Sequence, residues 1–271
     1  MIIELFGPPG AGKTTLAYAL ARRLQESGHR IDLMLSCRPA EYRLRSNGCS
    51  HGLPGLRLAA VPRRLTRPLF ELLAIAFRPS FISDDVRLTA GLLKILPPAN
   101  IAVAIRLSQY MLRLSHCWRR ASATRQVAVL DQAFVQLVCS LALLSRSVDP
   151  SLIAQALEFS PRADLFVRLD APPPVLAARL RERVRRQSAT ERLFELDLET
   201  NLKSIGIIDQ LDRLLRDRGH TVVRASSADL PSLTDSVAAI EAAVTVRART
   251  ARETAAQLNP SAISPVDEVA T

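Results

Sequence analysis

The first part of the chain carries the hydrophobic pattern of a strand, a helix and a second strand. Residues 2–6 form a short apolar run of strand length. Apolar side chains then recur at Leu16, Leu20 and Leu24, which is the spacing of one helix face. A second apolar run covers residues 31–35. A strand, a helix and a strand joined this closely require parallel pairing of the strands, which predicts an α/β fold.

The segment 37–126 departs from this pattern. It is rich in arginine and leucine, and prolines divide it into short pieces. Two stretches within it, at about 84–96 and 100–119, have the pattern of helices. We therefore interpret the segment as a mostly helical insertion that lies over the edge of the sheet.

The α/β alternation resumes after this insertion. The hydrophobic pattern predicts strands at 127–130, 165–169 and 221–224, and helices at about 133–145, 150–158, 172–186, 195–217 and 230–246. Residues 247–271 show no hydrophobic periodicity. We expect one α/β domain over residues 1–246, followed by a disordered tail.

Composition and charge narrow the class of partner that the chain can bind. The chain has 271 residues and a net charge of +10, which favours an anionic partner such as a nucleotide or a phosphate. Its arginines are spread along the sequence rather than clustered, so a nucleic-acid partner is disfavoured. The four cysteines lack the paired spacing of zinc sites, and the apolar stretches indicate strands and buried helices rather than a transmembrane segment or a secretory leader. A reducing cytoplasm is the expected location.

A glycine-rich loop lies between the first strand and the first helix. Gly7, Gly12, Lys13 and Thr14 fit the pattern G-x-x-x-x-G-K-[ST] without a mismatch. In this context the backbone amides cradle phosphates, the lysine bridges the β- and γ-phosphates of ATP, and the threonine hydroxyl holds Mg²⁺. The predicted nucleotide-binding loop consists of Gly7, Pro8, Pro9, Gly10, Ala11, Gly12, Lys13, Thr14 and Thr15.

Asp131 follows directly on the buried strand 127–130, at its carboxyl end. Ligands of open parallel sheets bind at this edge. A carboxylate there can hold Mg²⁺ or accept a proton from the phosphoryl acceptor. An ordinary helix N-cap is the alternative interpretation, and the two roles are compatible.

A basic stretch follows the strand at 165–169. Arg179 and Arg183 lie one turn apart on one helix face, where like charges repel unless an anion or solvent separates them. Arginines neutralise a phosphoryl group during its transfer. A solvated basic helix in an arginine-rich chain is the alternative interpretation.

Together these residues resemble the nucleoside and nucleotide kinases with a P-loop, and thymidylate kinase most of all. The resemblance covers about half of the chain; it rests on the loop and on residues 127–132, 169–183, 192–195 and 222–226. It implies a three-layer α/β sandwich with a five-stranded parallel sheet in the order 2-3-1-4-5. It also implies ATP and Mg²⁺ as cofactors, a lid at about 186–195, and a small-molecule phosphoryl acceptor. Such proteins are often homodimers.

The resemblance also implies roles for individual residues. Arg179 would pack on the adenine, and Arg183 and Arg192 would be lid arginines that close on the phosphates. Ala225 and Ser226 would line the adenine pocket. Arg38, after the second strand, resembles an arginine that contacts the acceptor phosphate.

The acceptor side departs from thymidylate kinase. Gln132 stands where that family has an arginine that contacts the acceptor phosphate, and the motif at 191–195 is one residue longer. We therefore expect a kinase for a small molecule, which includes nucleotides and nucleosides. The alternatives are a nucleotide-dependent switch that binds a protein through 37–126, and a polynucleotide kinase.

Overall fold

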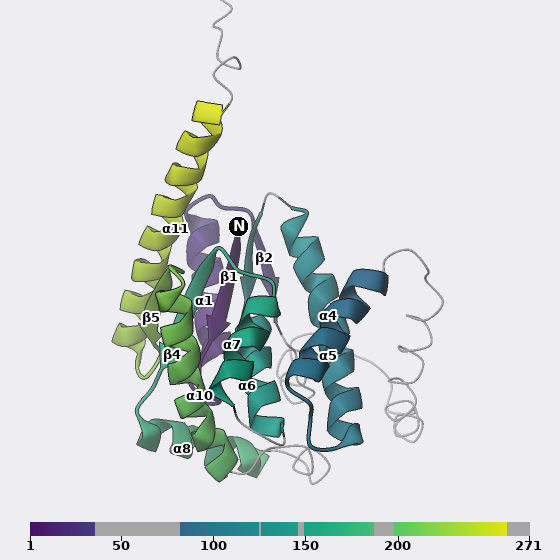
Figure 1. The fold of residues 1–271 in the computed structure, drawn as a ribbon. Coiled ribbons are helices and arrows are strands. Elements are labelled where there is room, and N and C mark those ends of the chain that lie inside the picture. Colours follow the sequence, from purple (N-terminus) through teal and green to yellow (C-terminus); the bar gives the residue numbers. More distant parts are fainter. Residues whose placement is uncertain (36–81, 125, 146–148, 187–197, 259–271) are drawn as a thin grey trace, which may run out of the picture.

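The computed structural model describes residues 1–35, 82–124, 126–145, 149–186 and 198–258 (Figure 1). Its sheet has five parallel strands in the order β2-β3-β1-β4-β5, which confirms the order that the resemblance implied. The strands are β1 (Ile2–Phe6), β2 (Ile31–Met34), β3 (Val127–Leu130), β4 (Leu165–Asp170) and β5 (Val222–Ser226). The helices are α1 (Lys13–Glu26), α4 (Ile82–Ile95), α5 (Ile101–Ser122), α6 (Phe134–Leu144), α7 (Pro150–Phe159), α8 (Pro173–Arg186), α10 (Leu198–Asp217) and α11 (Leu230–Leu258).

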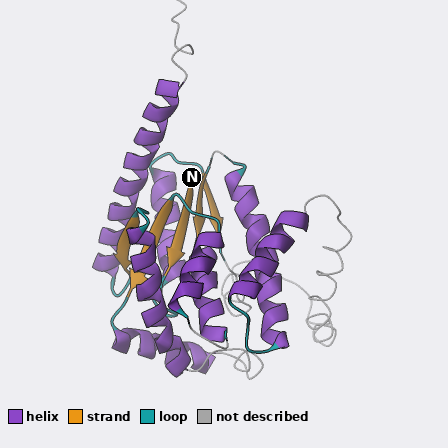
Figure 2. Ribbon diagram, in the orientation of Figure 1, coloured by secondary structure: helices purple, strands orange, loops and turns teal. Residues whose placement is uncertain are grey.

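Helices cover both faces of this sheet, so the molecule has three layers (Figure 2). Ile3 and Leu5 of β1 pack with α1 and α11 on one face. Ile2 and Phe6 face the other way, into the core formed with α4 to α7 and α10. Successive strand residues point to opposite faces, so Glu4 shares the face of Ile2 and Phe6. The two separate cores explain why every residue of β1 is buried.

The described part of the insertion is helical, as expected. Helices α4 and α5 pack against each other, and they contact α7 and α6 respectively. The side chain of Asn100 caps α5 by accepting a hydrogen bond from the amide of Val103 at 2.9 Å. Arg120 of α5 pairs with Asp32 of the edge strand β2 at 3.5 Å, so the helices lie beside the sheet edge. Residues 36–81 lie outside the described residues.

A network of ion pairs around Arg168 fixes the position of α10. The guanidinium of Arg168, on β4, is nearly buried and lies between three carboxylates. It is 2.9 Å from Asp170, 2.6 Å from Asp209 and 3.0 Å from Asp212. Asp209 and Asp212 belong to α10, which follows residues 187–197 in the chain. The network therefore holds this helix against the sheet.

The expected start of the tail at residue 247 is wrong, because α11 continues to Leu258. The segment lacks apolar periodicity, but it is rich in alanine and arginine, which have high helix propensity, and its next proline is Pro260. Val244 is fully buried, whereas Val246 is 65% exposed. Arg249, Thr250 and Glu253 are also exposed, so high helix propensity accounts for the helix at these positions. Residues 259–271 lie outside the described residues.

Among the described residues, no helix is both long and apolar enough to span a membrane.

Candidate functional site

The predicted phosphate-binding loop lies between β1 and α1, at the carboxyl ends of the parallel strands. Gly7, Gly10 and Gly12 have φ values of 151°, 84° and 93°, a region that residues with a Cβ atom rarely adopt. A Cβ atom on Gly7 would lie 2.3 Å from the backbone oxygen of Leu169 on β4. The glycines therefore give the loop both its conformation and its close approach to the sheet.

We expect Gly7→Ala to lower the free energy of unfolding by about 3 kcal/mol, because both strain and a backbone clash oppose it. Gly28→Ala is the matched control, since Gly28 has φ 84° but nothing within 4 Å of an added Cβ. It should cost only about 1 kcal/mol. Urea unfolding of both variants makes the comparison, and equal losses would contradict the role of the Leu169 contact.

Lys13 is the first residue of α1 and is almost completely buried. Its Nζ donates hydrogen bonds to the carbonyl oxygens of Gly7 at 2.7 Å and Pro8 at 3.1 Å. The lysine is thus folded back on the loop that precedes it. An amine held there can exchange carbonyl oxygens for phosphate oxygens without leaving the loop.

The structure brings together the two residues predicted to hold a metal. The hydroxyl of Thr14 donates a hydrogen bond to Oδ2 of Asp131 at 2.8 Å, and Asp131 is 1% exposed. Hydroxyl and carboxylate oxygens are ligands that Mg²⁺ prefers. Their juxtaposition at the start of α1 fits a Mg²⁺ ion bound beside phosphates.

Arg179 connects α8 with the loop. Its guanidinium donates hydrogen bonds to the carbonyl oxygens of Gly10 at 3.2 Å, Ser227 at 2.7 Å and Ala228 at 3.2 Å. One side chain thereby joins the phosphate-binding loop, α8 and the connection between β5 and α11. Packing of Arg179 on an adenine stays a prediction. The contacts place the arginine beside the predicted phosphate-binding loop.

Ser227 is a residue of this site that the sequence did not reveal. Its hydroxyl donates a hydrogen bond to the carbonyl oxygen of Ala11 in the loop. Ala225 and Ser226, predicted to line an adenine pocket, lie just before it, and Ser226 is held by the hydroxyl of Ser236 on α11. The connection after β5 therefore contacts the loop through Ser227, and the role of Ala225 and Ser226 in an adenine pocket stays a prediction.

The remaining predicted residues take no part in the contacts given above. Arg183 lies on α8 one turn beyond Arg179 and is half-buried, and Gln132 follows Asp131. Thr15 is exposed on α1. Arg38 and Arg192 lie outside the described residues, as does the segment 187–197, which holds most of the expected lid. The roles assigned to these residues stay predictions.

One further residue contacts the loop, and a second contacts the start of α6. Oε1 of Gln136, on α6, accepts a hydrogen bond from the amide of Gly7 at 3.3 Å. Oε1 of Glu4, on β1, accepts one from the amide of Val135 at 2.6 Å. The sequence held a signal for Glu4, which is the one charged residue of an apolar strand. It held none for Gln136, whose role depends on how α6 packs.

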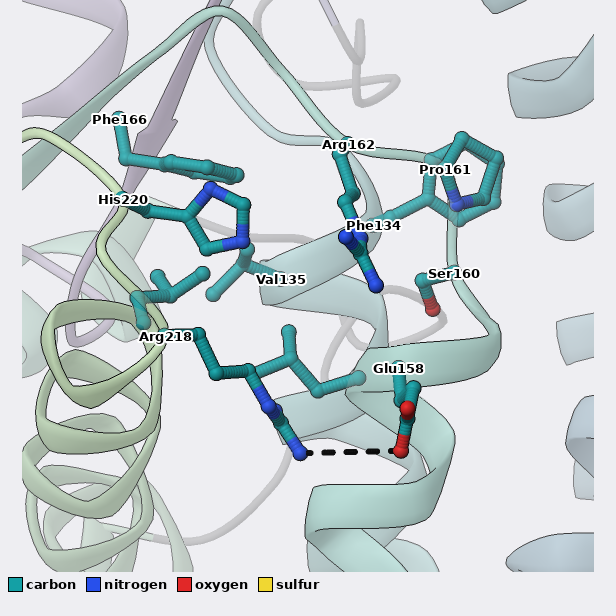
Figure 3. Close-up of a pocket in the computed structure, with 11 residues that line it drawn as sticks. Phe134, Val135, Glu158, Ser160, Pro161, Arg162, Phe166, Arg218 and His220 are labelled. Atoms are coloured by element: carbon teal, nitrogen blue, oxygen red, sulfur yellow. Dashed lines mark ion pairs between the residues drawn. The ribbon is translucent and has the colours of Figure 1, made fainter.

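A small hollow lies at the opposite edge of the sheet, near the amino ends of β4 and β5 (Figure 3). His220 lies edge-on to Phe166, with ring centres 5.4 Å apart. Burial and then the charge of Arg162 lower the pKa of His220. The hollow is lined by Phe134, Val135, Leu157, Glu158, Ser160, Pro161, Arg162, Phe166, Leu215, Arg218 and His220. None of the residues that line the hollow belongs to the phosphate-binding loop.

Known proteins resemble the chain over most of its length. Thymidylate kinases from three strains of Xanthomonas campestris pv. campestris are each 29% identical to it over 238 residues, which cover 84% of this chain and 85% of the relative. A solved structure of deoxyadenosine kinase from M. mycoides, with the products dCMP and dCDP bound, covers 91% of this chain and 100% of its own at 12% identity, with a TM-score of 0.45. The sequence matches no protein-family model.

Proposed function

We propose that this thymidylate kinase-like P-loop phosphotransferase transfers the terminal phosphoryl group of ATP, with Mg²⁺, to a nucleotide or a nucleoside. The observation that carries the proposal is the 2.8 Å hydrogen bond between Thr14 and Asp131, at the start of α1. It joins two oxygen atoms of the kind that Mg²⁺ prefers, beside a loop whose amides and lysine suit phosphates.

The residues of the loop have distinct tasks in such a transfer. The amides at the start of α1 bind phosphate oxygens, since Gly12 caps the helix without a side-chain hydrogen bond. Lys13 exchanges the carbonyl oxygens of Gly7 and Pro8 for phosphate oxygens and neutralises the charge that develops on them. Thr14 and Asp131 would hold Mg²⁺, which neutralises the phosphates and orients them. Arg183 and Arg192 would add positive charge from α8 and the lid.

The acceptor is assigned by class. The relatives that cover most of the chain are thymidylate kinases, which supports a nucleoside monophosphate acceptor. Gln132 carries no charge, so it offers hydrogen bonds but no ion pair to an acceptor phosphate. We therefore include nucleosides in the acceptor class. A homodimeric state and a cytoplasmic location stay predictions.

The proposal is tested by ADP release from ATP and Mg²⁺. The purified chain would be assayed alone, with single nucleoside monophosphates including dTMP, with single nucleosides, and with short oligonucleotides. Turnover that rises well above the acceptor-free rate with a nucleotide or nucleoside supports the proposal. Slow hydrolysis that no acceptor stimulates would overturn it in favour of a nucleotide-dependent switch, and stimulation by oligonucleotides alone would favour a polynucleotide kinase.

The metal site yields a second prediction. Thr14→Val removes the hydroxyl that contacts Asp131, so we expect kcat/KM to fall about 100-fold and half-maximal activity to require more Mg²⁺. Thr14→Ser keeps the hydroxyl and is the matched control. Its Mg²⁺ titration should superimpose on that of the wild type. A valine variant with an unchanged Mg²⁺ requirement would exclude Thr14 from the metal site.

A further inference from the structure

Helix α6 begins without the usual side-chain cap. Its N-cap residue is Ala133, which offers no side-chain acceptor, and its first turn contains no acidic residue. The first amides of a helix have no partner within the helix and need acceptors from elsewhere. By contrast, α7 is capped by the side chain of Asp149, which accepts from the amide of Ser151 at 2.8 Å.

Glu4 provides the missing acceptor from another element. It lies on β1, on the face that packs against α6, and its Oε1 accepts a hydrogen bond from the amide of Val135 at 2.6 Å. The nearby amide of Gln136 favours the charged form of this carboxyl group and so acts to lower its pKa. The start of α6 is therefore fixed by a strand residue 131 positions away in the sequence.

This arrangement has a high energetic cost. Glu4 is 0% exposed, and its Oε2 has no hydrogen-bond partner among the described residues. Burial raises the pKa of its carboxyl to about 8, although the two amides act in the opposite direction. An apolar residue would fill the same space in the core at lower cost. The benefit that Glu4 brings lies in the position of α6.

That position matters because α6 also contacts the phosphate-binding loop. Gln136, in the first turn of α6, is buried, and its Oε1 accepts a hydrogen bond from the amide of Gly7 at 3.3 Å. The carbonyl oxygen of the same glycine accepts from Nζ of Lys13. The peptide groups on either side of the Gly7 Cα are thus fixed by two side chains, Gln136 and Lys13.

We propose that Gln136 is a positioning residue for the phosphate-binding loop, and that Glu4 acts through it by fixing the start of α6. The inference rests on the proposed function, since the loop must bind a nucleotide for its conformation to matter. Lys13 gives up its hydrogen bond to the Gly7 carbonyl when phosphates bind, whereas Gln136 keeps its hydrogen bond to the Gly7 amide. Gln136 therefore preserves the shape of the loop during nucleotide exchange.

The test measures the affinity of each variant for ADP with Mg²⁺ by titration calorimetry. Gln136→Met removes the acceptor at similar volume, and one lost hydrogen bond should weaken binding about 3–10-fold. Val138→Ala on the same helix is the matched control, because it removes fully buried atoms that face the helical core. It should lower the melting temperature and leave ADP affinity unchanged.

Glu4 is tested by rescue and by a double substitution. Glu4→Gln keeps Oε1 as an acceptor and should bind ADP as the wild type does, whereas Glu4→Met should weaken binding to the level of Gln136→Met. The double variant Glu4→Met/Gln136→Met should bind no more weakly than Gln136→Met alone, because both act through one contact. Should Glu4→Met fail to fold, the comparison of Gln136→Met with Val138→Ala still decides the role of Gln136.

The outcomes separate this inference from the proposed function. A wild type that does not bind ADP contradicts the proposed function. A wild type that binds ADP, together with a Gln136→Met variant of unchanged affinity, overturns the inference alone. Additive losses in the double variant would mean that Glu4 stabilises the fold without acting through Gln136.

Discussion

Lys13→Ala is expected to reduce ATP turnover about 10³-fold or more, because the proposed function gives Lys13 the task of neutralising the transferred phosphoryl group. The fold should persist. Nζ of Lys13 bonds to two backbone carbonyl oxygens of the loop, and the loss of such bonds costs about 1–2 kcal/mol of stability. Circular dichroism and a melting curve confirm folding, and a coupled ADP assay with the best acceptor measures turnover.

A second lysine provides the control for this substitution. Lys94 lies on α4 and is exposed, and Lys94→Ala removes the same charge far along the sequence from the loop. Its turnover should match that of the wild type. Wild-type turnover in a folded Lys13→Ala protein would remove Lys13 from the catalytic machinery.

Glu4 is expected to make the stability of the chain strongly dependent on pH. The pKa of its carboxyl is raised from 4.5 to about 8 in the folded chain, because the group is completely buried. The folded chain therefore holds this proton more tightly than the unfolded chain. Its contribution is fully present below pH 4.5 and is lost as the pH rises towards 8, and linkage puts the total change at about 5 kcal/mol.

Glu4→Gln isolates this contribution, because glutamine imitates the protonated carboxyl and does not titrate. Urea unfolding would be measured for both proteins between pH 5 and 8.5. Near pH 5 the two should differ little, and at pH 8.5 the glutamine variant should be more stable by several kcal/mol. Glu26→Gln, at an exposed position of α1, serves as the control for the loss of a carboxylate. Parallel curves for the wild type and Glu4→Gln would show that the carboxyl keeps its ordinary pKa.

The strands could be predicted because the sheet is buried on both faces. A strand of this kind is an apolar run with turn residues at its ends; β3 fits that description fully, and β1 fits it except at Glu4. The loop and the contact between Thr14 and Asp131 could also be predicted from the sequence, since parallel strands bring their carboxyl ends to one edge of the sheet. The order of the strands came from the resemblance to thymidylate kinase.

Other features depend on tertiary packing that no short pattern encodes. The guanidinium of Arg179, the hydroxyl of Ser227 and the side-chain oxygen of Gln136 reach the loop from three different parts of the chain. The last helix was predicted too short because residues 247–258 have high helix propensity but no apolar periodicity. In both cases hydrophobic periodicity carried no information.

The extended end of α11 has a practical consequence. From Val244 to Leu258 the helix rises by about 20 Å at 1.5 Å per residue. Figure 1 shows that it leaves the body at the edge of the sheet where the N-terminus lies, away from the phosphate-binding loop. A surface anchor, dye or fusion partner attached after Leu258 would be held off the body by this helix. Immobilisation of the protein through that end would leave the phosphate-binding loop facing the solution.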